Sequence, residues 1–149
     1  MPVNQDYKDL FKILNEEKVE YLIVGAHAVI LYVEPRYTRD IDLWVNPTKE
    51  NVDSLWNALV KFGAPLIDIT KEEFENPNLI YQIGIEPNRI DIIMGMDKVS
   101  FAEAYNQKKG SFYDGIPINI ISISDLIKTK ENTGRKKDEL DIESLKDYL

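Results

Sequence analysis

The sequence predicts an α/β (α+β) fold in which helices flank a mixed β-sheet, and three observations support that prediction. Apolar runs with helical spacing are interspersed with short apolar runs typical of buried strands. Two pairs of strand-like runs are joined by short turns, which predicts two antiparallel hairpins. The order of the elements also departs from the regular alternation of a doubly wound parallel sheet. A sheet with both strand directions, covered by helices, satisfies all three observations.

The first half of the chain predicts three helices and two strands. Apolar residues recur at helical spacing over residues 7–14 and again over residues 52–59, where Thr48 can cap the second helix. Between these helices, "EYLIV" is a short buried strand that ends at Gly25, and "DIDLWV" is a second strand. The apolar run "AHAVILYV" suits either element, and its alanines and the preceding glycine favour a helix packed on the sheet.

The second half of the chain predicts two hairpins and three helices. The runs "NLIYQIGI" and "RIDIIM" are joined by "EPN", and "FYDGIPINI" contains the strong two-residue turn signal Asp114-Gly115. The segment "VSFAEAYNQ" between the hairpins is a predicted helix. Ser124 is expected to cap a helix that runs to about residue 131, and a last helix is expected over residues 137–148.

The length and composition favour one domain. The chain has 149 residues without an internal repeat or linker, so we expect residues 1–149 to form a single domain, with C-terminal helices from about 124 to 149 packed on the core. Cysteine is absent, which excludes disulfides and thiolate metal sites. No apolar run approaches the ~18 residues that span a membrane, and "MPVNQDYKDL" does not resemble a signal peptide. The expectation is therefore a cytoplasmic protein without a membrane partner.

The charge is distributed unevenly along the chain. The net charge is −8, and the segment from Lys128 onward contains six Lys/Arg and six Asp/Glu, so all of the excess lies in residues 1–127. This distribution argues against general nucleic-acid coat binding, which depends on neutralising phosphates. It suits a site that collects divalent cations.

Two carboxylates lie inside an otherwise apolar strand-like run. Because successive side chains of a strand alternate between faces, Asp40 and Asp42 point the same way, with Cβ atoms roughly 7 Å apart. Burying two like charges is costly, and a shared hard cation such as Mg²⁺ would remove the conflict. The competing interpretation is a solvated sheet face, which is the commoner reason for a D-x-D pattern on a strand.

A third carboxylate strengthens the interpretation as a metal site. Asp68 in "LIDIT" and Asp91 in "NRIDIIMG" both lie at the centre of apolar runs. Asp91 is favoured, because its run has the stronger strand pattern and, as the second arm of a hairpin, can lie beside the "DID" strand. Asp68 lies between the end of a helix and the loop-like "TKEEF".

At this point the sequence resembles the nucleotidyltransferase superfamily related to DNA polymerase β. The family pattern is an apolar strand, Gly-[Gly/Ser], a spacer, Asp-h-[Asp/Glu]-h, and a carboxylate on a later strand. Here the pieces are "LIVGA", 13 intervening residues, "DIDL", and a later "IDI". One departure is Ala26, which replaces the second Gly/Ser and has no hydroxyl to offer a triphosphate.

The resemblance is closer to small prokaryotic nucleotidyltransferases of the abortive-infection and toxin–antitoxin type. These carry R-x-T-x-D-[IL]-D, matched by Arg36, Thr38, Asp40 and Asp42. They also carry a late K…R-x-K-D-x-x-D, matched by Lys130, Arg135, Lys137, Asp138 and Asp141. The resemblance implies a nucleotidyltransferase-like fold and a transferase that moves an NMP from an NTP, with ATP the first candidate, to a hydroxyl acceptor with release of pyrophosphate.

The resemblance also implies roles for the matched residues. Asp40, Asp42 and Asp91 would be the catalytic and metal-binding carboxylates for two Mg²⁺ ions, with Mn²⁺ as a possible substitute. Gly25 and Ala26 would bind the triphosphate through the backbone at the start of a helix. Lys130 and Arg135 would add positive charge to the nucleotide site, although "GRKKDELD" also fits a solvated helix start.

Three questions stay open at the level of sequence. The acceptor is a partner protein, a tRNA or a small molecule, and a toxin–antitoxin or defence role is one context that the resemblance implies. His27, the single histidine, is more typical of a core histidine than of a ligand. Ala26 allows an alternative function as an inactive nucleotide- or partner-binding module, and metal-dependent phosphate-ester hydrolysis is a third, disfavoured interpretation.

Overall fold

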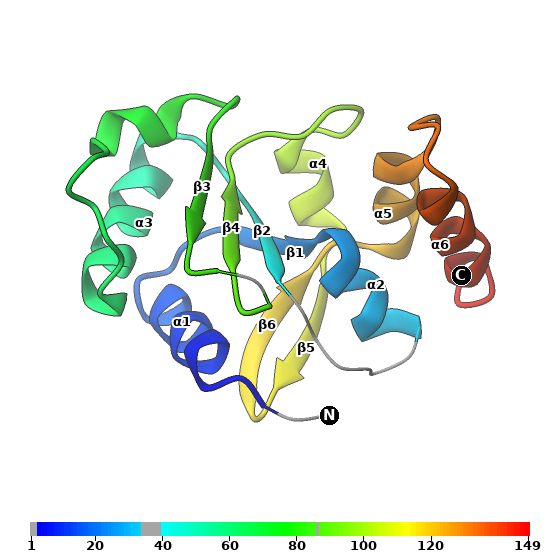
Figure 1. Ribbon diagram of the computed structural model, residues 1–149, viewed down its shortest axis with the longest axis horizontal. Helices are drawn as coiled ribbons and strands as arrows, with labels where there is room; N and C mark the ends of the chain where they lie inside the picture. Colours follow the sequence, from blue (N-terminus) through cyan, green and yellow to red (C-terminus); the bar gives the residue numbers. More distant parts are fainter. Residues whose placement is uncertain (1–2, 34–39, 86) are drawn as a thin grey trace.

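The computed structural model describes residues 3–33, 40–85 and 87–149. Along the chain it contains helices, strands and one 3₁₀ helix in an order that confirms the predicted sequence of elements, apart from the added 3₁₀ helix (Figure 1). The elements are α1 (Gln5–Glu16), β1 (Tyr21–Val24), α2 (Gly25–Val33), β2 (Ile41–Val45), α3 (Lys49–Phe62), η1 (Lys71–Glu75), β3 (Ile80–Ile83), β4 (Ile90–Ile93), α4 (Phe101–Asn106), β5 (Lys109–Tyr113), β6 (Ile116–Ile120), α5 (Ile123–Lys130) and α6 (Lys136–Lys146).

The strands form one mixed sheet in the order β3-β4-β2-β1-β6-β5. Both predicted hairpins are present as antiparallel pairs, β3 with β4 and β5 with β6. Asp114 and Gly115 have φ values of +47° and +82°, as a turn of the Asp-Gly type requires. The central strands β1 and β2 are antiparallel, whereas β2 runs parallel to β4 and β1 runs parallel to β6. The expected mixed sheet is therefore confirmed.

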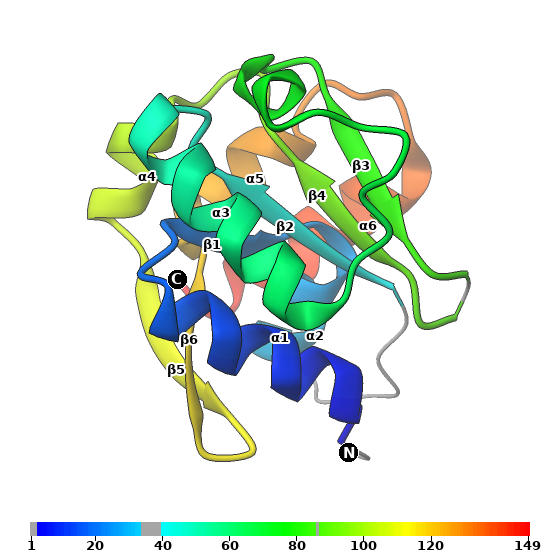
Figure 2. The ribbon, with the colours of Figure 1, turned by 90° about the vertical axis from the view of Figure 1, so that its left-hand side faces the viewer.

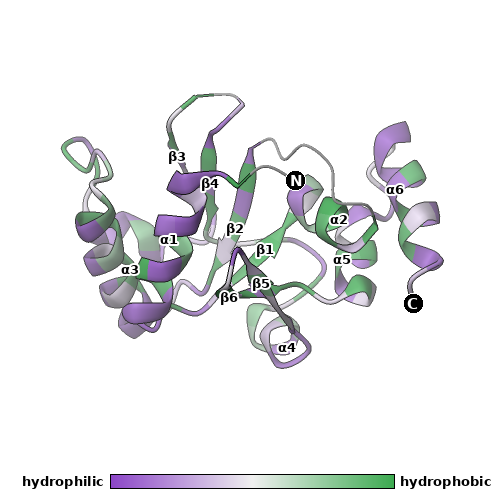
Figure 3. Cartoon of the chain, turned by 90° about the horizontal axis from the view of Figure 1, so that it is seen from below, coloured by the Kyte–Doolittle hydropathy of each residue, from purple (hydrophilic) through white to green (hydrophobic). Residues whose placement is uncertain are grey.

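Helices cover both faces of the sheet. Figures 1 and 2 show α1 and α3 on one face, and Figure 3, seen from below, shows α2 and α5 on the opposite side. The ring of Phe11 in α1 stacks on Tyr21, which places Tyr21 and its same-face neighbours under α1 and α3. Because strand side chains alternate, Asp42 and Asp91 belong to the other face, the side of α2 and α5.

Two details of the predicted elements are wrong. The N-cap of α5 is Ser122, whose hydroxyl accepts a hydrogen bond from Asp125 N, so Ser124 lies inside the helix. Both serines suit a cap, and the helix begins at the earlier one because the chain turns directly after the buried Ile121. The 3₁₀ helix η1, which buries Phe74, has no counterpart in the prediction, because its short polar sequence has no helical periodicity.

The described residues include no helix that is both long and apolar enough to cross a membrane.

Candidate active site

The sheet brings the predicted carboxylates together through its strand register. Asp42 on β2 is the direct partner of Asp91 on β4, and on its other side Asp42 is paired with Val24, the last residue of β1. Asp40 immediately precedes β2. Asp91 is 8% exposed, so its carboxylate lies in a largely desolvated position. Three acidic side chains from two parallel strands thus meet where β1 ends and α2 begins.

Gly25 makes the closest backbone approach to this cluster. Its φ is +67°, a left-handed conformation that side chains rarely adopt. A Cβ atom built there would lie 2.3 Å from Asp42 Oδ2, well inside a van der Waals contact. Only a glycine therefore lets the chain turn from β1 into α2 beside Asp42. The Gly25-Ala26 pair predicted to contact phosphate lies at the first turn of α2, directly next to the carboxylates.

Arg89 is a site residue that the sequence reasoning missed. Its backbone N–H donates a 2.9 Å hydrogen bond to Asp40 Oδ1, and its Nε donates a 2.8 Å hydrogen bond to Asp91 Oδ1. Its Nη2 lies 3.1 Å from Asp91 Oδ2 and 3.5 Å from Asp40 Oδ2. One guanidinium therefore bridges two of the three carboxylates. The available signal was the spacing R-x-D, which places Arg89 on the same side of the chain as Asp91.

The crowding of negative charge changes the acidity of Asp42. Burial, followed by the charge of Asp91 and a hydrogen bond with it, raises the pKa of Asp42 to about 7. The positive charge of Arg89 acts in the opposite direction. The cluster thus holds more negative charge than the guanidinium of Arg89 neutralises, which is the electrostatic environment expected of a site that binds cations.

The fit to divalent ions follows from the donor atoms. All three side chains offer carboxylate oxygens, the ligands that Mg²⁺ and Mn²⁺ prefer. Among residues 3–33, 40–85 and 87–149, however, no group of three or more His, Cys, Asp or Glu side chains is placed to hold a metal ion. The guanidinium of Arg89 instead forms ion pairs with the carboxylates of Asp40 and Asp91. The donor set fits the ion, and Arg89 would have to release these oxygens before they could coordinate one.

His27 lies in the first turn of α2, buried to 1% exposure. Burial lowers the pKa of His27 to about 4, so the imidazole is neutral at pH 7. Its two ring nitrogens have no hydrogen-bond partner among the described residues, and its ring contacts Tyr7 edge-on with centroids 6.0 Å apart. These contacts match the core histidine that the sequence favoured over a ligand.

Lys130 and Arg135 make their ionic contacts within the C-terminal helices. Lys130 is 9% exposed, and its ammonium lies 3.3 Å from Asp138 Oδ1 and 3.1 Å from Asp141 Oδ2. Arg135 Nε donates a 2.9 Å hydrogen bond to Asp138 Oδ2. These contacts join the end of α5 to α6. Among the described residues, no contact joins either cation to Asp40, Asp42 or Asp91, so their predicted role in nucleotide binding stays a prediction.

Asp138 is the centre of that C-terminal ion cluster. Burial acts to raise the pKa of Asp138, but hydrogen bonds from Thr133 and Lys130 and the positive charges of Lys130 and Arg135 lower it overall. The carboxylate is therefore ionised and holds Lys130 and Arg135 in place. Arg36 and Thr38 of the R-x-T-x-D-I-D motif lie outside the described residues.

Comparisons with known proteins identify a family that the chain matches and solved structures that share its fold. A profile of the family described as "Nucleotidyl transferase of unknown function (DUF2204)" matches residues 3–149. No curated protein matches the chain.

Three solved structures share the fold, each at 16% identity. The lincomycin-bound crystal structure of the lincosamide antibiotic adenylyltransferase LnuA has a TM-score of 0.63, with 100% of both chains covered. The solution structure of antibiotic-resistance factor ANT(2'')-Ia has a TM-score of 0.61, covering 95% of this chain and 80% of that one. An antigenic nucleotidyltransferase-like protein from Paracoccidioides brasiliensis has a TM-score of 0.54, covering 97% and 78%.

Proposed function

The chain belongs to this nucleotidyl transferase family, and from that premise we propose that it transfers a nucleoside monophosphate from an NTP to a hydroxyl group of a small molecule. ATP is the first candidate donor, because one of the structural neighbours is an adenylyltransferase. The observation that carries the proposal is the direct pairing of Asp42 with Asp91 beside the backbone of Gly25.

The proposed reaction is a displacement at the α-phosphorus. A bond forms between the acceptor oxygen and the α-phosphorus, and the bond from that phosphorus to the oxygen bridging to the β-phosphate breaks. Pyrophosphate leaves with that bridging oxygen. The proton of the acceptor hydroxyl passes to Asp91, whose carboxylate faces the site and acts as the general base.

The protein contributes positioning and charge. Asp40, Asp42 and Asp91 would hold two Mg²⁺ ions, which neutralise the attacking and leaving oxygens when bound. The backbone N–H groups at the first turn of α2 would orient the phosphates, since Gly25 brings the main chain within reach of the site. Ala26 contributes its N–H without a hydroxyl, so the contact with phosphate depends on the backbone.

The test measures label transfer and pyrophosphate together. The protein is incubated with Mg²⁺, α-³²P-labelled NTPs in turn and the small-molecule filtrate of a bacterial lysate. We expect label transfer and pyrophosphate release to fall at least about 100-fold in Asp42→Asn and Asp91→Asn. Asp68→Asn is the matched control, because Asp68 is an exposed aspartate outside the site, and it should behave as wild type.

Each other outcome has a defined meaning. Nucleotide binding without pyrophosphate release would indicate an inactive binding module, and free monophosphate would indicate a hydrolase. Label that appears only when the protein or tRNA fraction of the lysate replaces the filtrate would overturn the small-molecule acceptor and support the toxin–antitoxin or defence context. Either nucleotide binding without pyrophosphate release or formation of free monophosphate would overturn the proposed transferase function.

A further inference from the structure

The guanidinium of Arg89 lies on two of the three carboxylates, where the donor set fits a divalent ion. Its Nε and Nη2 donate hydrogen bonds of 2.8 and 3.1 Å to Oδ1 and Oδ2 of Asp91, which is a bidentate pairing. The same Nη2 lies 3.5 Å from Asp40 Oδ2. An ion bound by Asp40 and Asp91 would need these oxygens, so the guanidinium and the ion exclude one another at this place.

The main chain of Arg89 is held separately from its side chain. The Arg89 N–H donates a 2.9 Å hydrogen bond to Asp40 Oδ1, and the Arg89 carbonyl oxygen accepts hydrogen bonds from Ile41 N and the Tyr7 hydroxyl. The Arg89 side chain is 26% exposed, compared with 10% for the side chain of Lys130. The guanidinium can therefore leave the carboxylates by rotation of its own side chain, while the strands stay in place.

We propose that Arg89 is a phosphate-binding residue with two positions: on Asp40 and Asp91 in the protein without nucleotide, and on the nucleotide phosphates when NTP binds with Mg²⁺. This inference rests on the proposed function and adds a residue and an order of events to the same site. Without nucleotide the protein binds a divalent ion weakly, because Arg89 holds the oxygens that the ion needs.

The order of the strands puts the second position within reach of Arg89. Strands β1, β2 and β4 are neighbours, so Gly25 at the end of β1 and Asp91 on β4 lie about two strand spacings apart, roughly 10 Å. In the proposed function the phosphates extend from the start of α2 toward the carboxylates, and the α-phosphorus reacts beside Asp91. A guanidinium that starts on Asp91 therefore reaches the phosphates by a short side-chain movement.

The charges favour this exchange of partners. An ion on Asp40 and Asp91 takes the carboxylate partners of the guanidinium and repels its positive charge. The nucleotide supplies new anionic oxygens, and the planar fork of an arginine pairs with two phosphate oxygens as it does with a carboxylate. An ion without nucleotide offers Arg89 no such replacement, so the binding of ion and of nucleotide is coupled.

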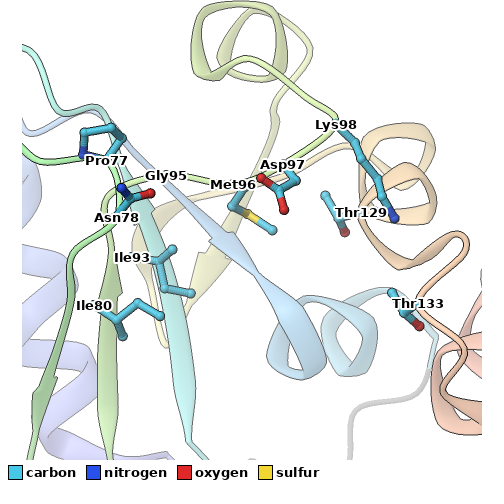
Figure 4. A pocket seen from close by; sticks show the side chains of 10 residues that line it. All are labelled: Pro77, Asn78, Ile80, Ile93, Gly95, Met96, Asp97, Lys98, Thr129 and Thr133. Carbon is cyan, nitrogen blue, oxygen red and sulfur yellow. The ribbon is translucent and has the colours of Figure 1, made fainter.

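Two other candidate cations have different partners. A cleft of about 540 Å³ is lined by the end of β4, the loop after it and part of α5, and Figure 4 shows the Lys98 side chain running from that loop toward α5. The Lys98 ammonium donates a hydrogen bond to the carbonyl oxygen of Glu131. Lys130 belongs to the ion cluster between α5 and α6. Arg89 contacts the carboxylates directly, and the phosphate contact is therefore assigned to it.

The first experiment locates the guanidinium by nuclear magnetic resonance. The ¹H–¹⁵N signal of Arg89 Nε is assigned by its loss in Arg89→Lys. The ligand is α,β-methylene-ATP with Mg²⁺, because this analogue cannot be cleaved between the α- and β-phosphates. We expect the signal to shift and to gain a scalar coupling to ³¹P. Absence of ³¹P coupling in protein saturated with the analogue overturns the inference, whether or not the signal shifts.

The second experiment compares two affinities in one variant. Arg89→Gln should bind Mn²⁺ about tenfold more tightly without nucleotide, because the competing guanidinium is absent. It should bind α,β-methylene-ATP with Mg²⁺ at least about threefold more weakly, because a phosphate contact is lost. Misfolding would weaken both affinities, so opposite shifts exclude it. If Arg89 stayed on the carboxylates, the affinity of Arg89→Gln for the analogue would equal or exceed that of wild type, which overturns the inference.

Two further variants serve as comparisons. Arg89→Lys keeps the positive charge without the planar fork, so it should bind the analogue more tightly than Arg89→Gln. Equal affinities of these two variants would mean that the charge at this position does not reach the phosphates, and would overturn the inference. Lys71→Gln removes an exposed ion pair with Asp53 and should match wild type in both affinities.

Failure of the inference and failure of the proposed function give different results. A wild-type protein that binds no analogue with Mg²⁺ and releases no pyrophosphate from any NTP overturns both. A protein that binds the analogue and releases pyrophosphate, while Arg89 stays on Asp91, overturns the inference alone.

Discussion

At Gly25 the main chain turns from β1 into α2 with its α-carbon against the carboxylate of Asp42. Replacing Gly25 with Ala puts a methyl group 2.3 Å from Asp42 Oδ2 and also strains a φ of +67°. Asp42 or the helix start must therefore move. We expect transfer activity to fall at least about 100-fold, since displacements of about 1 Å at a reacting site have effects of this size. The measurement is the rate of pyrophosphate release.

The control for that change is Gly63→Ala. Gly63 caps α3 with a φ of +88°, and a Cβ there meets nothing within 4 Å. Both substitutions carry the backbone strain of about 1 kcal/mol, and only the change at Gly25 crowds the site. Equal activities in the two variants would refute the importance of the close approach.

The acidity of Asp42 predicts how stability depends on pH. Burial, then the charge and hydrogen bond of Asp91, raise its pKa from 3.8 to about 7 on folding. The folded state therefore binds a proton more tightly than the unfolded state. The resulting stabilisation is complete below pH 3.8 and is lost as the pH rises through about 7.

Without divalent ions, the melting temperature of wild type should thus decrease as the pH is raised from about 5 to about 8. A loss on the order of 2 kcal/mol in the free energy of unfolding corresponds to a decrease of roughly 4–8 °C. Asp42→Asn removes the titrating group and should flatten this part of the profile. Thermal unfolding of both proteins by circular dichroism measures the difference. Parallel profiles would contradict the raised pKa.

Arg89 would compete with any metal ion that binds the carboxylates. Its guanidinium bonds Asp91 and lies 3.5 Å from Asp40 Oδ2, so an ion must displace it. Arg89→Gln should strengthen Mn²⁺ binding about tenfold, a change of about 1.4 kcal/mol, measured by titration calorimetry. The same variant without metal should be less stable, because the carboxylates lose their neutralising charge. Lys71→Gln, which removes an exposed ion pair with Asp53, should change neither property.

The carboxylates were predictable from sequence and Arg89 was not, for a physical reason. A charge inside an apolar strand run conflicts with its surroundings, so Asp40, Asp42 and Asp91 were conspicuous. Arg89 sits at the polar edge of its run, directly after "EPN", where a charged residue is ordinary. The importance of Arg89 depends on which strands are neighbours. Strand β4 lies beside β2, although 44 residues separate the end of β2 at Val45 from the start of β4 at Ile90.

At the scale of elements, the ion cluster of Lys130 joins two helices. Its ammonium is buried between Asp138 and Asp141, and removing it leaves two acidic groups at the junction of α5 and α6. Lys130→Met should therefore lower the free energy of unfolding by about 3 kcal/mol, measured by urea denaturation. Lys128→Met is the control, since the Lys128 side chain is 60% exposed, and it should cost less than about 1 kcal/mol.

The same variant tests the predicted role of Lys130 in nucleotide binding. A structural role lowers stability and leaves the KM for ATP of the folded protein unchanged. A raised KM for ATP with unchanged stability would instead assign the lysine to the nucleotide site.

The predicted elements succeeded where periodicity was strong. The apolar stripe of α3 and the Asp114-Gly115 turn are local signals, and both elements appear at the expected place. The cap of α5 was misplaced by two residues because Ser122 and Ser124 offer the same hydroxyl. The 3₁₀ helix η1 buries Phe74 against the rings of Trp56 in α3 and Tyr81 in β3. Because these contacts come from distant parts of the chain, no local sequence pattern predicts η1.

At the scale of the whole molecule, we expect the chain to unfold as one cooperative domain, as its length predicts. Hydrogen bonds from Tyr148 to the Val33 carbonyl and from Tyr32 to the Ile121 carbonyl join the segments that follow α6 and β6 to α2. Near-ultraviolet circular dichroism reports the buried Trp44 and Trp56, which is partly buried against the core, and the far-ultraviolet signal reports all helices. Their thermal transitions should coincide, and an earlier far-ultraviolet transition would mean that α5 and α6 unfold separately.

The register between β2 and β4 carries a consequence for folding errors. Because side chains alternate, a slip of one residue in β4 would bring Ile90 or Ile92 opposite Asp42 and send Asp91 to the reverse side of the sheet. Such a molecule would keep its hydrogen-bonded ladder and much of its compactness, yet could not gather the acidic groups. Quality control of this protein in the cell would then have to recognise a misaligned but well-ordered species.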